Sequence, residues 1–312
     1  MQCGFSVNPR HDGDRRLSPF FQHTLASTAH FSGDGIHTGK VVEVAIRPAP
    51  AGAGICFART DVEGADHLIP ARGEAVCQTR LGTVIGNDDG VTVSTVEHLM
   101  AALSALAIDN AIVELDGPEV PIMDGSAVPF LAALDRAGRR RQEARRLYIE
   151  ILEPIAVTDD DKRAALIPAD RFEVAFEILF DSRAIGRQQV DLAVDEATFR
   201  HELADCRTFG FLHEVEALRA AGLARGGNLD NVVVIEGDSV INDGGLRRPQ
   251  EFVRHKAVDA IGDLYLLGAP IIGRYEGLYS GHGLNNALVR ALMATPNAWR
   301  YSSARQQLAT AV

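Results

Sequence analysis

Cysteine is scarce in this chain, and the few cysteines are scattered. The 312 residues include four of them, Cys3, Cys56, Cys77 and Cys206, and no two form a CxxC pair. A disulfide framework or a zinc site built from thiolates needs cysteines at closer, paired spacings. The pattern argues against both, and it favours a reducing, cytoplasmic location.

Long apolar runs are also missing. A membrane-spanning helix needs about 20 consecutive apolar residues, and no stretch approaches that length. Residues 1–20 are polar, contain Pro9, Gly13 and Pro19, and lack the apolar core of a signal peptide. We therefore expect a soluble protein without a membrane span, in which residues 1–20 form a loose extension.

Positive charge is in short supply. The chain has 31 Lys and Arg against 42 Asp and Glu, and its net charge is −11. Binding of nucleic acid depends on Lys and Arg that neutralise phosphates, so this balance argues against a nucleic-acid partner. An anionic small molecule would need a local basic site.

The remaining composition is that of a globular protein with room for two domains. Hydrophobic residues make up 46% and charged residues 23% of the chain. Residues 41–50 alternate as a strand does, residues 89–106 pass from a strand into a helix, and residues 110–121 return to a strand. Because these elements follow no regular βαβ rhythm, we expect an α+β fold.

An arginine-rich run at residues 137–148, AGRRRQEARRLY, precedes a new strand, YIEILEPIAV. We place a domain boundary there, with a first domain at residues 21–140 and a second at residues 141–312. A solvated helix end followed by a linker explains the run, and a basic patch for a nucleotide is the alternative.

The segment FVRHKAVDAIGDLY at residues 252–265 predicts an amphipathic helix. At about 100° per residue its apolar residues share one stripe, whereas His255, Asp259 and Asp263 line the opposite side. An imidazole and a carboxylate one turn apart suit a divalent metal ion. A solvated polar face is the alternative for this side of the helix.

A second predicted helix matches the first. VEHLMAALSAL at residues 96–106 aligns with VRHKAVDAIGDL at residues 253–264 so that His98 meets His255. Small residues on the side of His98 would let another helix come close. We infer a duplicated domain whose two copies press these helices together, although so short a match also arises by coincidence. His98, His255 and Asp259 would then form a usual ligand set for catalytic zinc.

Two further residues suggest acid–base chemistry beside such a metal. Glu97 precedes His98 as in HExxH proteases, but position 101 is alanine, so this is not an HExxH site. Glu97 can still act as a general base, and a solvent-facing helix residue is the alternative. His282 lies between glycines, where a bond from Asp263 would keep it protonated to stabilise an oxyanion and protonate a leaving amine. An ordinary turn histidine is the alternative.

CRTFGF at residues 206–211 supplies a hydroxyl and an aromatic ring. Thr208 could bond an oxyanion, and Phe209 could pack on a sugar. A Thr-Phe pair within a strand is also ordinary structure, so the two residues alone decide nothing.

These motifs resemble those of the LpxC family, the UDP-3-O-acyl-N-acetylglucosamine deacetylases of lipid A synthesis. The matching segments are GIHTGK (35–40), STVEHLMAAL (94–103), IDNAIVELDGPEVPIMDGSAVPF (108–130), AIGRQ (184–188), RTFGF (207–211), EFVRHKAVDAIGDL (251–264) and SGHGLNN (280–286). The resemblance implies a zinc amidase that removes acetate from the 2-acetamido group of UDP-3-O-(3-hydroxyacyl)-N-acetylglucosamine. It implies one catalytic zinc ion, with iron(II) as the alternative in the cell. The expected partners are this small-molecule substrate and water, and we expect a monomer.

The resemblance also implies a role for each polar residue of the site. The zinc ligands of the family correspond to His98, His255 and Asp259. Glu97 resembles the general base, His282 resembles the acid that stabilises the oxyanion and protonates the amine, and Asp263 resembles its partner.

Substrate contacts follow from the same resemblance. Thr208 matches the residue that binds the oxyanion, and Lys256 matches the cation beside substrate and transition state. Phe209 matches the aromatic near the glucosamine ring. Lys162 and Phe180 fall where the family contacts the nucleotide.

The family fold consists of two similar α+β domains, each a β-sheet layered on helices, with the helices packed between the two sheets. A βαβ insert in the second domain, matched here at about residues 209–235, forms an apolar passage for the acyl chain. The residues expected to line it are Leu212, Val215, Ala224, Leu229 and Val234. Ordinary core packing is the alternative for these residues.

Two other functions compete with the deacetylase. One is a zinc amidase of the same fold that acts on another N-acyl sugar. The other is a catalytically dead homologue that only binds UDP-sugars or a partner. The presence of every expected catalytic residue argues against the second.

Overall fold

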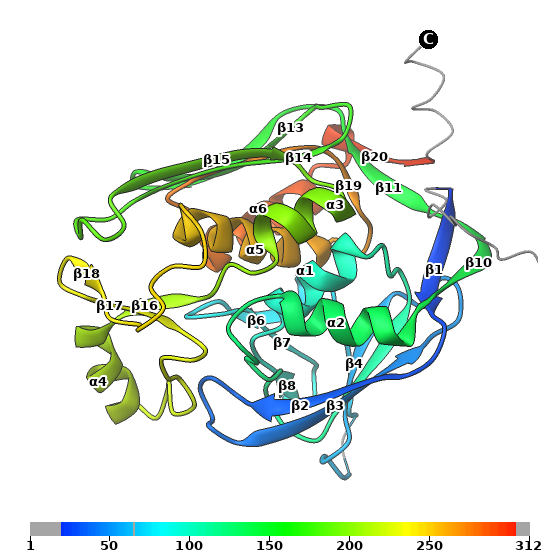
Figure 1. Cartoon of the computed structure of the whole chain (residues 1–312). Helices are drawn as coiled ribbons and strands as arrows, with labels where there is room; N and C mark the ends of the chain where they lie inside the picture. The colour runs from blue at the N-terminus through cyan, green and yellow to red at the C-terminus, as the bar shows by residue number, and fades with distance from the viewer. Residues whose placement is uncertain (1–19, 65, 304–312) are drawn as a thin grey trace, which may run out of the picture.

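A computed structural model describes residues 20–64 and 66–303. The expected loose extension at residues 1–20 lies, apart from residue 20, outside the described residues. Two large β-sheets face each other, and helices fill the space between them (Figure 1). The fold is thus α+β, with each sheet layered on helices as the sequence predicts.

The first large sheet has five strands in the order β2-β3-β9-β4-β5. Its strands are β2 (Ala29–Asp34), β3 (Val41–Pro48), β9 (Ala111–Leu115), β4 (Ile55–Arg59) and β5 (Leu68–Pro70). Alternate residues of β3, namely Val42, Val44 and Ile46, are buried, because successive side chains of a strand point to opposite faces. This apolar face supports the helices α1 (Glu97–Ala105) and α2 (Val128–Ala137) (Figure 1).

A small three-stranded sheet precedes α1. It consists of β6 (Val76–Gln78), β7 (Val84–Gly86) and β8 (Thr92–Val93), and a short helix, η1 (Gly73–Ala75), leads into it. Because β8 ends only a few residues before α1 begins, this sheet lies close to the first turn of that helix.

The second large sheet has seven strands. They are β11 (Leu147–Ile151), β12 (Ile155–Asp159), β13 (Lys162–Ile167), β14 (Phe172–Leu179), β15 (Arg187–Ala193), β19 (Ile271–Leu278) and β20 (Trp299–Ser303). Strand β19 is central and changes partners along its length: residues 271–272 pair with β11, and the following residues lie between β13 and β14. Outside the insert, the helical segments of this half are α3 (Glu196–Thr198), η2 (Phe199–Leu203), α5 (Glu251–Tyr265), α6 (His282–Met293) and η3 (Pro296–Ala298).

Helices α1 and α5 pack directly on each other in the layer between the sheets. A Cβ atom at Gly262 of α5 would clash with the backbone oxygen of Glu97 of α1, so only glycine permits this approach. His255, Asp259 and Asp263 are at most 4% exposed. The solvated polar face considered for residues 252–265 is therefore wrong, because the second helix covers that side.

The arginine-rich run differs from its interpretation as a helix end and linker. Helix α2 does end at Ala137, but Arg139–Arg145 form a strand, β10, that pairs with β1 (Phe21–Leu25). The guanidinium groups of Arg141 and Arg145 lie 4.3 and 4.8 Å from the centre of the Phe21 ring. Stacking on the aromatic ring of Phe21 stabilises the side chains of Arg141 and Arg145 on the same side of the strand. This strand crosses residue 140, and the domain division at that point stays a proposal.

The expected βαβ insert is present. Strands β16 (Phe209–Phe211) and β17 (Val233–Glu236) are parallel, and α4 (Leu212–Ala220) connects them. Strand β18 (Ser239–Val240) completes a three-stranded sheet at the side of the molecule (Figure 1). A parallel pair of strands needs a crossover connection, which explains why α4 lies between β16 and β17 in the chain.

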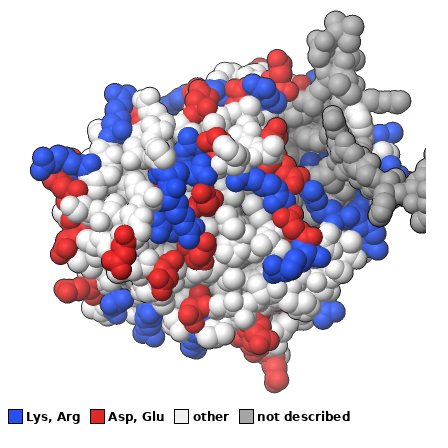
Figure 2. All heavy atoms as spheres, in the orientation of Figure 1, with Lys and Arg blue, Asp and Glu red and all other residues white. Residues whose placement is uncertain are grey.

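The surface carries mixed charge. Basic and acidic side chains are interspersed on the face that Figure 2 shows. Ion pairs include Arg200 with Asp135 at 2.6 Å and Arg274 with Asp191 at 2.8 Å. None of the helices in the described residues combines the length and the hydrophobicity that a membrane span requires.

Candidate active site

The three predicted metal ligands converge at the contact between α1 and α5. Nε2 of His98 lies 3.4 Å and Nε2 of His255 lies 3.3 Å from Oδ1 of Asp259. All three ligand atoms lie within 4.8 Å of one another, and all three residues are buried. One ligand comes from α1 and two come from α5, so the helix contact itself assembles the cluster.

The geometry and chemistry of this cluster fit a divalent ion. Two ligands at the usual zinc distances of about 2.0–2.1 Å in tetrahedral geometry lie about 3.3–3.4 Å apart, which matches both spacings. Oδ1 of Asp259 is buried and has no hydrogen-bond partner among the described residues. Nδ1 of His255 lies 3.1 Å from the backbone oxygen of Cys206. A bond donated by that nitrogen leaves Nε2 free to bind a metal.

The pKa values of the ligands follow from burial and mutual contact. Burial outweighs the charge of Asp259 and lowers the pKa of His255 to about 4. Burial opposes ionisation of Asp259, yet the neighbouring His255 and Lys256 hold its pKa well below the usual value. Burial likewise acts against a charged His98, but contact with Asp259 raises its pKa overall. A metal ion would compete with a proton for that imidazole nitrogen.

Glu97 and His282 lie close to each other beside the cluster. Oε1 of Glu97 is 4.0 Å from Nε2 of His282, and the same nitrogen is 3.9 Å from Oδ2 of Asp259. Burial raises the pKa of Glu97 against the charges of His282 and His98. A carboxyl group with a raised pKa is suited to accept a proton near neutral pH.

His282 is paired with Asp263, as the sequence predicts. Nδ1 of His282 lies 2.9 Å from Oδ2 of Asp263. Burial disfavours the charged imidazole, but the charge and the hydrogen bond of Asp263 raise the pKa of His282 to about 9. The imidazole therefore carries a proton at neutral pH and can donate it from Nε2.

Two residues of this network escaped the sequence analysis. Thr83 bonds Oδ1 of Asp263 through its hydroxyl at 2.6 Å, and its backbone N–H donates to Oε2 of Glu97 at 3.0 Å. Asn285 donates to Oδ2 of Asp263 at 2.8 Å and accepts a bond from Tyr275. A single threonine or asparagine carries no periodic signal, although Asn285 does lie within the SGHGLNN motif.

The predicted substrate residues divide between the site and its surroundings. Nζ of Lys256 is 3.3 Å from Oδ2 of Asp259. The ring of Phe209 lies 6.3 Å from that of His255 and 5.9 Å from that of Phe180, centre to centre. These side chains thus adjoin the metal cluster. In contrast, Lys162 is exposed at the start of β13, in a hairpin with β12.

An apolar cavity of about 330 Å³ extends from the site into the insert. The five residues predicted for the acyl passage, Leu212, Val215, Ala224, Leu229 and Val234, all line it. Thr208 and Phe209 also line this cavity. Leu229 is 46% exposed, which an open passage explains and ordinary core packing does not.

The GIHTGK loop closes one side of this cavity and depends on a buried acid that the sequence analysis did not single out. His37 and Ile36 line the cavity. The fully buried carboxylate of Glu119 accepts bonds from the backbone N–H of His37 and of Thr38, both at 2.9 Å. The insert joins the loop through the N–H of Gly226, which donates to Ile36 at 3.1 Å. Glu119 therefore holds the loop that forms one wall of the passage.

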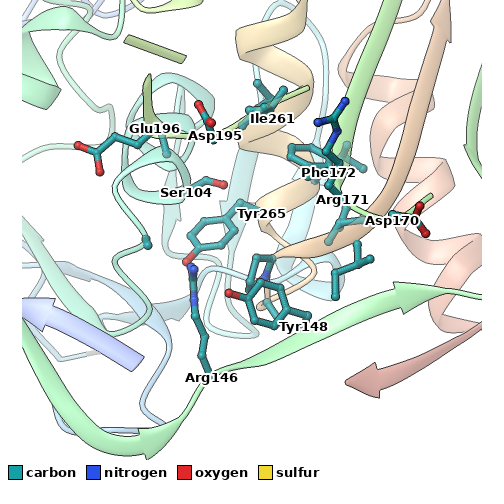
Figure 3. Close-up of a pocket in the computed structure, with 18 residues that line it drawn as sticks. Ser104, Arg146, Tyr148, Asp170, Arg171, Phe172, Asp195, Glu196, Ile261 and Tyr265 are labelled. Atoms are coloured by element: carbon teal, nitrogen blue, oxygen red, sulfur yellow. The ribbon is translucent and has the colours of Figure 1, made fainter. Parts of the chain in front are cut away.

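A second cavity, of about 490 Å³, lies on another face of α5. Figure 3 shows Arg146 and Tyr265 pointing toward one another inside it. Arg146 is paired with Asp109 at 2.7 Å, and the hydroxyl of Tyr265 donates to Ile108 at 2.8 Å. Of the described residues that line this cavity, none belongs to the predicted site. The two cavities are therefore distinct.

Comparison with known proteins identifies the family. The model of the family described as LpxC, UDP-3-O-acyl N-acetylglycosamine deacetylase, matches residues 22–294. The chain is 67% identical over 292 residues to a UDP-3-O-acyl-N-acetylglucosamine deacetylase of Phenylobacterium zucineum, covering 94% of this chain and 100% of that protein. The chain belongs to the LpxC family. This confirms the family that the sequence motifs indicate.

Less similar members of the LpxC family also match over most of their length. The deacetylase of Myxococcus xanthus is 48% identical over 292 residues, covering 94% of this chain and 92% of that protein. That of Acidithiobacillus ferrooxidans is 49% identical over 282 residues, covering 90% of this chain and 92% of that protein. The likeness therefore extends over most of the chain.

Proposed function

We propose that this chain hydrolyses the 2-acetamido group of UDP-3-O-(3-hydroxyacyl)-N-acetylglucosamine and releases acetate, as a metal-dependent deacetylase of lipid A biosynthesis. The observation that carries the proposal is that His98, His255 and Asp259 lie close enough together to hold one ion, while Nε2 of His282 lies 3.9 Å from Oδ2 of Asp259 and 4.0 Å from Oε1 of Glu97. Membership of the LpxC family supports the substrate. We propose zinc as the ion and the cytoplasm as the compartment, with the protein acting as a monomer.

The metal ligands would hold zinc through two imidazole nitrogens and one carboxylate oxygen. When bound there, zinc supplies Lewis acidity that activates a water molecule and polarises a carbonyl group. Glu97 then takes the proton of the attacking water. The N–H of Thr83 holds Oε2 of Glu97 at 3.0 Å, which leaves Oε1 directed to the reacting atoms.

His282 completes the reaction as the acid. Its proton stabilises the developing oxyanion and then passes from Nε2 to the leaving nitrogen, so that the C–N bond breaks and a neutral amine is released. Asp263 keeps the imidazole charged until that step. Thr208 and Lys256 would add a hydroxyl and a positive charge beside the oxyanion.

The cavity in the insert would take the acyl chain. Its apolar lining would shield a long acyl chain from water. Each buried CH₂ group would contribute about 0.8 kcal/mol to the free energy of binding. Phe209 would pack against the glucosamine ring, and Phe180 beside it would contact the nucleotide. Lys162 would reach the nucleotide only from the exposed hairpin of β12 and β13.

Acetate release tests the proposal directly. Purified protein with measured metal content is assayed on acylated UDP-N-acetylglucosamine and on the same sugar without its 3-O-acyl chain, before and after chelation. We expect turnover that needs metal and falls strongly without the acyl chain. Equal turnover on both sugars would favour a zinc amidase for another N-acyl sugar. Tight metal without turnover would favour a homologue that only binds UDP-sugars.

A further inference from the structure

Thr83 touches both halves of the acid–base machinery. The residue is 1% exposed and lies between β6 and β7, outside both ligand-bearing helices. Its hydroxyl is 2.6 Å from Oδ1 of Asp263 and 3.3 Å from Nδ1 of His282. Its backbone N–H donates to Oε2 of Glu97 at 3.0 Å. One residue of the first half of the chain thus contacts the base, the acid and the partner of the acid.

The hydroxyl settles the orientation of the Asp263 carboxylate. Oδ2 of Asp263 already accepts hydrogen bonds from Nδ1 of His282 at 2.9 Å and from the side-chain amide of Asn285 at 2.8 Å. Among the described residues, the side chain that donates to Oδ1 is that of Thr83. A carboxylate can only accept, so the threonine must give its proton to Asp263. Without this bond, a buried oxygen is left unpaired and the carboxylate can rotate away from His282.

The backbone around Thr83 is built for close contact with the base. The preceding residue, Gly82, has a φ of 155°, and a Cβ atom there would stand 3.0 Å from Oε1 of Glu97. Glycine therefore lets the chain pass directly beside Glu97. The backbone N–H of Thr83 therefore bonds the base, Glu97, and its side-chain hydroxyl remains available to bond Asp263.

We propose that Thr83 is a positioning residue for the reaction. Its hydroxyl holds Asp263 in the orientation that aims Nε2 of His282 at the leaving nitrogen, while its N–H holds Glu97. This inference rests on the proposed function for its effect on turnover. The orientation of His282 itself can be measured without turnover.

The test compares Thr83→Val, which removes the hydroxyl but keeps shape and backbone N–H, with Thr83→Ser, which keeps the hydroxyl. Thr24→Val is the matched control, because Thr24 is also fully buried but bonds only backbone groups. Each zinc-loaded protein is assayed for metal content, kcat and KM on acylated UDP-N-acetylglucosamine. For Thr83→Val we expect kcat to fall roughly 10- to 100-fold, as loss of one hydrogen bond to a charged group predicts. KM and metal content should stay unchanged, and Thr83→Ser should remain within about threefold of the wild type.

A double variant shows whether Thr83 acts through Asp263. In an Asp263→Ala background, Thr83→Val should change kcat by less than about threefold, because the group that the hydroxyl positions is gone. If the kcat reductions of the two single variants multiplied in the double variant, the two residues would act independently, and the proposal would be overturned. Loss of metal together with kcat, or failure of both Thr83→Val and Thr83→Ala to fold, would show a structural role and overturn it as well.

NMR spectroscopy gives the readout that does not need turnover. The Nδ1–H proton of His282 is observed in zinc-loaded protein labelled with nitrogen-15 histidine and is assigned with a His282→Gln variant. We expect this resonance to shift and to exchange faster with water in Thr83→Val, and to be retained in Thr83→Ser. An unchanged resonance in Thr83→Val would overturn the proposal. If the wild-type protein released no acetate, the proposed function would fail while this measurement still decided the role of Thr83.

Discussion

Replacing Asp263 by asparagine should move the alkaline limb of the pH–rate profile toward neutral pH. In the wild-type protein, burial lowers the pKa of His282, but the charge and the hydrogen bond of Asp263 raise it to a net value of about 9. Without the carboxylate, the pKa should fall toward the ordinary imidazole value of about 6.5. At about pH 7.5 the protonated fraction would then drop from roughly 97% to roughly 10%, which predicts an about tenfold fall in kcat/KM.

The sign of this change follows from the role of His282 as the acid. Activity needs the protonated imidazole, so the rate falls as the pH rises through its pKa: near 9 in the wild type and nearer neutrality in the variant. The assay is acetate release at substrate concentrations below KM, measured from about pH 6 to about pH 10. Metal content is matched between samples.

Asp135→Asn is the control for the change of charge. Asp135 is an acid remote from the site that pairs with Arg200 at 2.6 Å, and its removal should leave the alkaline limb in place. An alkaline limb that stays near pH 9 in Asp263→Asn would refute the reasoning. It would mean that a group other than His282 sets this limb.

Three further predictions concern the metal, the base and the passage. Asp259→Ala should lose metal affinity and activity together, because it removes the only carboxylate of the described cluster; metal content measured after dialysis checks this, and retained metal would exclude the ligand role. Glu97→Gln should keep its metal while kcat falls about 10²- to 10⁴-fold, the usual contribution of a general base; an unchanged kcat would show that another group takes the proton. Val215→Trp should fill the cavity and raise KM for long acyl chains with little effect on short ones, and equal KM changes for both would place the chain elsewhere.

Local pattern was enough to predict the elements that carry the site. Apolar residues repeat at helical spacing in both ligand helices, and α1 and α5 begin within one residue of the predicted segments. The residue types at 98, 255 and 259 indicate a metal, because imidazole and carboxylate are the groups that zinc binds. The residues themselves suggested an acid and its partner in His282 and Asp263, and the family motifs supported those roles.

The arginine-rich run shows where local pattern misleads. Its composition suggests a solvated linker, yet it forms β10 because β1, far away in the sequence, offers strand pairing and the ring of Phe21. Thr83 shows a related limit. Nothing in its neighbourhood marks it, and its importance comes from Asp263 and Glu97, which other parts of the chain bring to it.

By itself, the sequence determined the α+β class, the two ligand helices, the ligand types and the family, because helical and strand periods and residue chemistry are local properties. Only the tertiary structure decided that the polar sides of α1 and α5 face each other and exclude water. Glycine at position 262 permits that contact, and burial then sets the pKa values of Glu97 and His282. Distances between residues remote in the chain depend on how the two sheets press their helices together, and no local pattern contains that information.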